Sequence, residues 1–251
     1  MSVTRAWVRG CGRAGRRACG SLLLLAACSR GATKSADQAT ADSLNAPGRS
    51  AVSGDAPQST GARQRILFVG TSLTAGLGLE ADSAYPALIQ QKIDSAGLPF
   101  ETVNAGVSGE TTAGLLERLD WLLRGDFAVL VLETGANDGL RGVPVSAVKE
   151  NLRTALERIR AKRPDARIAL IQMEALPNLG PTYAREFHAI YADLARQENV
   201  TLLPFLLNGV AGKRSLNQND GIHPNYEGEH IVADNVWRGL RPLLAAAAPS
   251  A

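Results

Sequence analysis

The chain from Arg65 onward predicts an α/β fold, a three-layer α/β/α domain built on a parallel sheet. Short apolar runs alternate with longer amphipathic segments, and the apolar runs are almost uninterrupted. Strands that are apolar at nearly every position are buried on both faces, which is typical of a parallel sheet covered by helices on both sides. We expect this domain to span residues 64–246, with a leader at 1–27 and a linker at 28–63 before it.

Five apolar runs predict the strands, and the segments between and after them predict helices. In 145–162, for example, apolar residues recur at helical spacing, at Val148, Leu152, Leu156 and Ile159. The predicted strands are Ile66–Val69, Phe100–Val103, Ala128–Leu132, Ile168–Gln172 and Thr201–Pro204, and the predicted helices lie near 82–96, 111–124, 145–162, 182–198 and 226–244.

Residues 1–27 have the pattern of an export leader. Five arginines and no acid precede the short apolar run LLLLAA, which ends at Cys28. The run is far shorter than the roughly 20 residues that a membrane-spanning helix needs. Leu25-Ala26-Ala27-Cys28 resembles the lipobox of bacterial lipoproteins, in which the cysteine is lipidated. We therefore expect an exported bacterial lipoprotein on the periplasmic side of a membrane, and an ordinary secretory signal is the alternative.

Residues 29–62 are rich in Ala, Ser, Gly, Asp and Thr and contain no aromatic residue. Such a composition cannot bury enough apolar surface to offset the entropy of ordering, so we expect a flexible tether. Subtracting the leader's charge of +5 from the net charge of +3 leaves −2 for the remainder, which gives no indication of nucleic-acid binding. Cys11 and Cys19 fall in the leader, so the mature chain forms no internal disulfide.

Ser72 lies where the first predicted strand breaks into a glycine-rich turn, in ILFVGTSLTAGLGL (66–79). Ligands of open α/β sheets bind beyond the carboxyl ends of the strands. A serine at such a position is either a helix cap or a nucleophile, and a nucleophilic serine needs a base. Of the three histidines, His188 and His230 fall inside predicted helices, which favours surface or packing roles, whereas His223 lies in the turn-rich DGIHPN.

Asp220 precedes His223 by three residues, a spacing that brings a carboxylate to the imidazole Nδ1 in a turn. The alternative is that both residues cap the last helix. Asn137, after the most hydrophobic strand, offers an amide donor for an oxyanion, and Gly109 allows a backbone N–H to approach a ligand. Asn-Asp-Gly on its own is more often a plain turn.

The segments GTSLTAG, VSGETT, GAND and DGIHPN occur in the order and approximate spacing of four sequence blocks of the SGNH, or GDSL-type, hydrolases. The chain resembles that family over residues 65–244, above all its bacterial periplasmic branch with thioesterase I, lysophospholipase and arylesterase activities. The resemblance implies a flavodoxin-like sandwich with a five-stranded parallel sheet. It also implies that Ser72 is the nucleophile, His223 the base and Asp220 its orienting acid, with an oxyanion hole formed by Ser72, Gly109 and Asn137.

Two residues depart from the family pattern. Thr71 replaces the usual aspartate of Gly-Asp-Ser-Leu, which removes a charge next to the nucleophile, although the threonine hydroxyl can replace some of its hydrogen bonds. Ala136 stands where this branch commonly has a second glycine. We expect the first change to affect the alignment of Ser72 without abolishing activity.

The predicted function is therefore a serine esterase that hydrolyses a small acyl ester or lysolipid through an acyl-enzyme. We expect a monomer held at a membrane by its lipid anchor, with no metal and no cofactor, because the sequence contains no His/Cys cluster of ligand spacing. The alternatives are a polysaccharide or cell-wall O-acetyl deacetylase and a non-catalytic acyl- or glycan-binding lipoprotein. A predicted loop over the site contains Leu176, Leu179 and Tyr183. These side chains either line an acyl pocket or pack within a lid.

Overall fold

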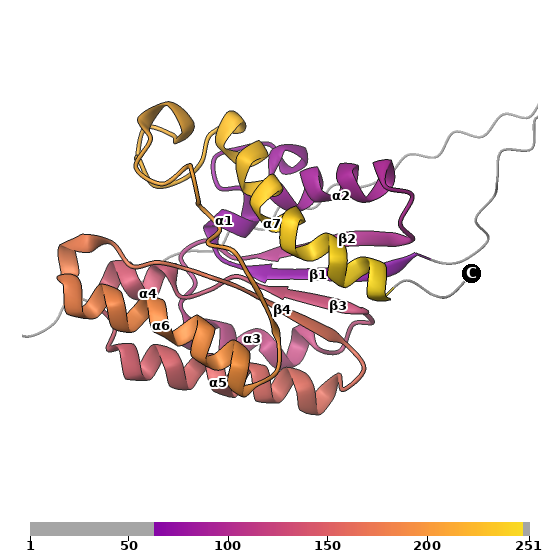
Figure 1. Ribbon diagram of the computed structural model, residues 1–251, viewed down its shortest axis with the longest axis horizontal. Coiled ribbons are helices and arrows are strands. Elements are labelled where there is room, and N and C mark those ends of the chain that lie inside the picture. The colour runs from indigo at the N-terminus through magenta and orange to yellow at the C-terminus, as the bar shows by residue number, and fades with distance from the viewer. Residues whose placement is uncertain (1–62, 248–251) are drawn as a thin grey trace, which may run out of the picture. The chain divides into compact units, whose positions relative to one another are not determined.

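The computed structural model describes residues 63–247, which form one sheet with helices on both of its faces (Figure 1). The predicted leader, Cys28 and the predicted linker up to residue 62 lie outside the described residues. The predicted three-layer α/β/α fold is confirmed, and so is the five-stranded parallel sheet that the resemblance implied.

All five strands are parallel, in the spatial order β2-β1-β3-β4-β5. Each of the predicted strands coincides with an observed one. The chain first adds β2 on one side of β1 and then crosses to add β3 on the other side, so the strand order reverses between β1 and β3. Ligands bind at such a reversal in open α/β sheets. The strands are β1 (Gln64–Gly70), β2 (Phe100–Gly106), β3 (Val129–Leu132), β4 (Arg167–Ile171) and β5 (Thr201–Leu203).

The long helices divide between the two faces of the sheet. In Figure 1, α2 and α7 cover one face and contact each other, whereas α3, α5 and α6 cover the other. Each predicted helix coincides with one of these five. Their bounds are α2 (Tyr85–Ser95), α3 (Thr112–Leu122), α5 (Val145–Lys162), α6 (Pro181–Gln197) and α7 (Tyr226–Ala247).

The main differences from the sequence-based expectation are short elements. The helices α1 (Ser72–Ala75) and α4 (Ala136–Arg141) follow β1 and β3 directly and are too short to show an apolar period. The helix expected near residue 82 begins at Tyr85, because Pro86 lacks an N–H and fits best in the first turn. Single 3-10 turns lie at η1 (Ala81–Ser83), η2 (Pro177–Leu179) and η3 (Arg214–Leu216).

The core is continuous across both faces of the sheet. All four residues of β3 are buried, and Phe68 of β1 packs edge-on against Tyr85 of α2, with ring centroids 5.7 Å apart. On the other face Phe187 and Tyr191 of α6 are fully buried and in contact. Burying each such aromatic contributes on the order of 2–3 kcal/mol. The carboxyl end of β1, which carries Ser72, therefore lies against a well-packed core.

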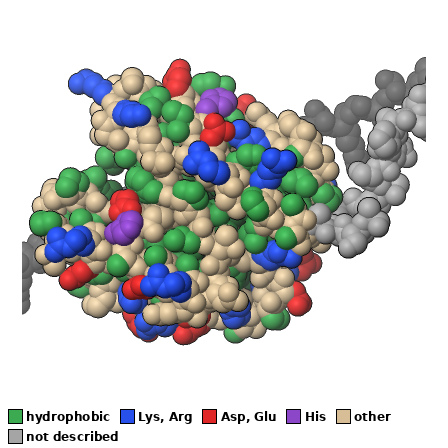
Figure 2. Space-filling model, viewed as in Figure 1, with side chains coloured by type: hydrophobic (Ala, Val, Ile, Leu, Met, Phe, Trp, Pro, Cys, Tyr) green, Lys and Arg blue, Asp and Glu red, His purple; other side chains and the backbone are tan. Residues whose placement is uncertain are grey.

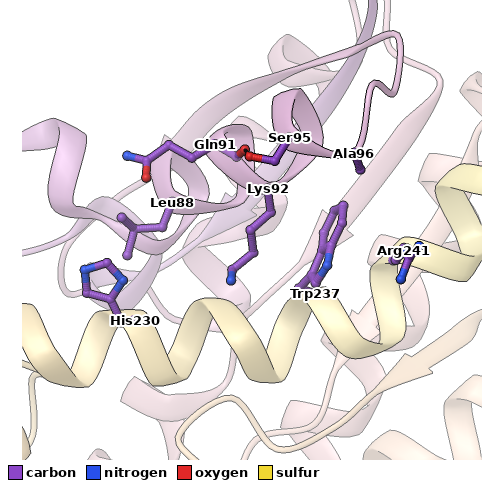
Figure 3. Close-up of a pocket in the computed structure, with 8 residues that line it drawn as sticks. All are labelled: Leu88, Gln91, Lys92, Ser95, Ala96, His230, Trp237 and Arg241. Atoms are coloured by element: carbon purple, nitrogen blue, oxygen red, sulfur yellow. Dashed lines mark hydrogen bonds between the residues drawn. The ribbon is translucent and has the colours of Figure 1, made fainter.

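A shallow cavity of about 530 Å³ lies between α2 and α7, on the outer side of one helical layer (Figure 3). His230 and Trp237 of α7 face Lys92 of α2 there, and Lys92 forms an ion pair with Asp234 at 2.6 Å. His230 itself is exposed and packs edge-on against Tyr226 at 4.8 Å. No helix among residues 63–247 is long and apolar enough to cross a membrane.

Glu229 of α7 is a buried carboxyl group that joins the two helices of this layer. Its Oε2 accepts the backbone N–H of Tyr85 at 2.9 Å, at the start of α2, where Ala84 provides no side-chain cap. Burial raises the pKa of Glu229 to about 8, only partly offset by this hydrogen bond. The carboxyl group is therefore largely protonated in the folded protein at neutral pH.

This pKa predicts a specific pH dependence of stability. The unfolded chain releases the Glu229 proton near pH 4.5 and the folded chain near pH 8, so the free energy of unfolding falls as the pH rises between these values. The contribution reaches about 1.4 kcal/mol per pH unit. Urea unfolding from pH 5 to 8 should show a shallower decline for Glu229→Gln than for the wild type. Glu227→Gln, an exposed neighbour on α7, is the control, and equal slopes in all three proteins would contradict the assignment.

Candidate active site

Ser72 lies at the carboxyl end of β1, as the first residue of α1, and is 7% exposed. Its Oγ is 2.8 Å from Nε2 of His223, which comes from the loop before α7, 151 residues further along the chain. The structure thus brings together the serine and the one histidine that lay outside the predicted helices.

Asp220 holds His223 from the other side. The carboxylate Oδ2 is 2.7 Å from the imidazole Nδ1, and Oδ1 accepts the backbone N–H groups of His223 and Ile222 at 3.0 Å each. The backbone N–H groups of His223 and then Ile222 lower the pKa of Asp220 to about 2. An ionised acceptor at Nδ1 keeps the proton on that nitrogen, which leaves Nε2 free to accept the Ser72 hydroxyl proton.

Gln218 ties this histidine turn to the serine side of the site. Its Nε2 donates to the backbone oxygens of Leu77 at 2.7 Å and Pro224 at 2.9 Å, and its own N–H donates to His223 O at 2.7 Å. Asn217 supports the same loop by donating to Val210 O and Lys213 O. The sequence analysis missed both residues, since polar side chains in a loop carry no pattern that separates support from solvent exposure.

The two further donors predicted from the sequence lie on the same side of the site. Gly109 has a φ of +79°, the left-handed conformation that favours glycine, and Asn137 lies in the first turn of α4. Asn137 Nδ2 donates one hydrogen to Glu110 O at 2.9 Å. Among the described residues, no acceptor binds the N–H of Ser72 or of Gly109. One cavity is lined by all four residues: Ser72, Gly109, Asn137 and His223.

Two contacts hold the Gly109 and Asn137 segments together. The buried carboxylate of Asp138 accepts the N–H of Thr112 at 2.9 Å and its hydroxyl at 2.7 Å, which fixes α4 to the start of α3. Arg141 donates to Gly109 O at 3.0 Å. Ala136, the second departure from the family pattern, begins α4 and forms part of the cavity wall.

The turn that carries Ser72 is anchored by a buried carboxylate that the sequence analysis missed. Glu133 follows β3 and accepts the N–H of Thr71 at 2.7 Å, the Thr71 hydroxyl at 3.0 Å and the Thr74 hydroxyl at 2.8 Å. Burial raises the pKa of Glu133, and the hydrogen bonds from Thr71 and Thr74 act against that shift. The sequence feature that could have indicated this role is a glutamate directly after the wholly apolar strand β3.

These contacts explain how Thr71 serves in place of aspartate. A hydroxyl donates to Glu133, whereas an aspartate at the same buried position would set a second carboxylate against the first. Thr71 and Glu133 are both completely buried, and two like charges in such a site cannot both ionise. Threonine therefore matches the acceptor that this chain provides.

The cavity beside Ser72 has a volume of about 580 Å³ and mainly apolar walls. Leu73 and Leu77 lie near the serine, Leu140 comes from α4, and Leu176 and Phe205 come from the loops after β4 and β5. Figure 2 shows hydrophobic side chains gathered around an indentation at the left of the face shown, with acidic, basic and histidine side chains beside them and elsewhere on that face.

The loop residues predicted as either pocket or lid divide between these roles. Leu176 lines the cavity, whereas Leu179 and Tyr183 do not. Tyr183 donates to Val143 O at 2.8 Å and stacks on Phe187, which is a packing role. Within residues 63–247, no group of three His, Cys, Asp or Glu side chains is arranged to hold a metal ion.

The Glu133 anchor predicts that the Thr71 hydroxyl stabilises the fold. Thr71→Val keeps the volume and the backbone donor but leaves a buried carboxylate with one donor fewer, which should lower the free energy of unfolding by about 1–3 kcal/mol. Thr71→Ser keeps the hydroxyl and should lose less. Urea unfolding at pH 7 measures both, and a Val variant as stable as the Ser variant would contradict the role of this hydrogen bond.

Comparison with known proteins identifies the family of the chain. Residues 68–231 match the model of the GDSL-like lipase/acylhydrolase family. The chain is 40% identical over 184 residues to "Esterase TesA" of Pseudomonas aeruginosa, covering 73% of this chain and 90% of that protein. It is 38% identical to "Thioesterase 1/protease 1/lysophospholipase L1" of Escherichia coli, covering 73% of this chain and 86% of the relative.

Solved structures of esterases also resemble this chain. The psychrotrophic esterase EstA from Pseudoalteromonas sp., in a structure inhibited by monoethylphosphonate, superimposes with a TM-score of 0.68 at 34% identity, covering 72% of this chain and 99% of that one. The family model spans more than half of the chain, and the similarity to curated relatives covers most of their length. The chain therefore belongs to the GDSL-like lipase/acylhydrolase, or SGNH hydrolase, family and is a carboxylic ester hydrolase.

Proposed function

We propose that this protein is a serine esterase that cleaves acyl esters of lipid or aryl type through a covalent acyl-enzyme. The observation that carries the proposal is the hydrogen-bonded chain from Ser72 Oγ through His223 to Asp220, with distances of 2.8 and 2.7 Å, beside a mainly apolar cavity. Relatives named esterase, thioesterase, lysophospholipase and arylesterase support this range of substrates.

In the first step, His223 Nε2 takes the proton from Ser72 Oγ as the oxygen attacks the ester carbonyl carbon. The resulting oxyanion is held by the N–H groups of Ser72 and Gly109 and by the second amide hydrogen of Asn137. His223 then passes its proton to the leaving alcohol or thiol, which departs and leaves the acyl group on Ser72. Asp220 stabilises the imidazolium in both steps.

Water completes the reaction by the same route. His223 takes a proton from water as the hydroxide attacks the acyl-enzyme, and the proton then passes to Ser72 Oγ as the carboxylic acid leaves. All five proposed groups come from one chain, so we propose that the enzyme acts as a monomer. The apolar cavity supports acyl chains over the acetyl groups of a polysaccharide, since a sugar would require more polar walls.

Substitutions in the site should affect turnover in a graded order. Ser72→Ala should reduce kcat for a short p-nitrophenyl ester by at least about 10⁴-fold. Asn137→Ala should reduce it by about 10²–10³-fold, because one oxyanion donor is lost. The exposed Asn178→Ala is the matched control and should leave kcat unchanged.

A fluorophosphonate probe provides a second test, since it reacts with an activated serine and should label the wild type but not Ser72→Ala. Full activity of Ser72→Ala would contradict the mechanism. A wild type that is neither labelled nor active would instead favour the non-catalytic binding protein.

We also propose that the enzyme is exported and anchored through lipidated Cys28 on the periplasmic side of a membrane. The order of arginines, apolar run, small residues and cysteine in the first 28 residues supports this proposal. Stable attachment requires more than one acyl chain, which lipoprotein modification supplies.

Replacing the cysteine tests the anchor separately from catalysis. Cys28→Ala should move the esterase to the soluble fraction or block removal of the leader, as seen by fractionation and mass spectrometry. The matched control is Cys19→Ala, which changes a cysteine within the leader. Wild-type membrane association of Cys28→Ala would exclude lipidation as the means of attachment.

A further inference from the structure

The cavity beside Ser72 contains one unexpected charge. Glu174 is the only carboxylate among the residues that line it, and no lysine or arginine lines it. The remaining polar lining side chains are Ser72, Asn137, Asn217 and His223, of which the first two and the last already have roles in the proposed reaction. A carboxylate in a mainly apolar cleft has no part in that mechanism.

Glu174 is held in place from outside the cleft. It follows the buried Met173 in the loop after β4, and its Oε1 is 2.6 Å from Nδ1 of His188 on α6. The backbone oxygen of His188 in turn accepts a hydrogen bond from Gln172 at 3.2 Å. The described residues offer Glu174 Oε2 no hydrogen-bond partner, and the side chain remains 32% exposed. One carboxylate oxygen is therefore oriented and the other is available to a ligand.

The charge of this group acts on whatever occupies the cleft. The hydrogen bond to Oε1 orients the carboxylate without removing its negative charge. The apolar walls limit screening by water, so a cation in the cleft is attracted and an anion is repelled more strongly than at an open surface. No lysine or arginine lines the cavity, and the nearby Arg141 is bonded instead to the carbonyl oxygen of Gly109.

We propose that Glu174 forms a cation-binding subsite, so that the esters preferred by this enzyme carry an ammonium group within reach of the cleft. This inference rests on the proposed esterase function and adds a substrate class to it. The charge lies on either the alcohol or the acyl part of the ester, and the experiment distinguishes these two positions.

Two pairs of shape-matched esters test the subsite at pH 8. For the alcohol side, butyrylcholine is compared with its uncharged isostere 3,3-dimethylbutyl butyrate. For the acyl side, the ethyl ester of 4-(trimethylammonio)butanoic acid is compared with ethyl 5,5-dimethylhexanoate. Acid release in a pH-stat gives kcat and KM for each. The wild type should prefer the cationic member of one pair by about tenfold in kcat/KM, mainly through a lower KM.

Glu174→Gln keeps the shape of the side chain and removes its charge. It should bring the ratio within the preferred pair close to one, mainly by raising KM for the cationic ester. Glu157→Gln, an exposed carboxylate on α5 outside the cavity, removes the same charge elsewhere and should keep the full preference. High salt should reduce the wild-type preference.

Each outcome decides a separate point. No cationic preference in either pair, or a preference that survives in Glu174→Gln, overturns the subsite while leaving the esterase function intact. The subsite is also wrong if the wild type hydrolyses p-nitrophenyl butyrate but none of the four esters. A wild type that hydrolyses no ester at all contradicts the proposed function itself.

Discussion

The buried carboxylate of Glu133 joins the two strands between which the sheet reverses its order. It accepts three hydrogen bonds from Thr71 and Thr74, the residues on either side of the dipeptide Ser72-Leu73. A carboxylate in this position would be costly without donors, because burial opposes its charge. The geometry of the serine turn therefore depends on the end of β3 as much as on its own sequence, and the replacement of aspartate by threonine becomes consistent with its surroundings.

The histidine side of the site is held mainly by hydrogen bonds within one local turn. Asp220, Ile222 and His223 form a local turn in which one carboxylate binds two backbone N–H groups and the imidazole. Gln218 bonds that turn to Leu77 beyond α1. Local hydrogen bonds thus orient the His223 ring and favour the tautomer with its proton on Nδ1, and a long-range contact joins its turn to the serine side.

The cleft connects this chemistry to substrate choice. Its walls come from five segments that follow strands or precede α7, and most of them are apolar, which supports acyl chains as ligands. Glu174 interrupts that apolar surface at one point, held by His188 from the layer of α6. In the proposed reaction, bond cleavage and substrate preference therefore depend on separate groups, so the second can change without loss of the first.

The sequence by itself determined the fold class, the five strands, the long helices and the candidate residues Ser72, Gly109, Asn137, Asp220 and His223. Apolar periodicity and short motifs are local properties, and burial in a parallel sheet leaves them visible in the chain. Only the tertiary structure decided that Glu133 anchors the serine turn, that Gln218 positions the histidine loop, and that Glu174 rather than Tyr183 faces the cleft. These roles arise from contacts between residues far apart in sequence, and a single glutamate or glutamine has no periodicity that would reveal its partner.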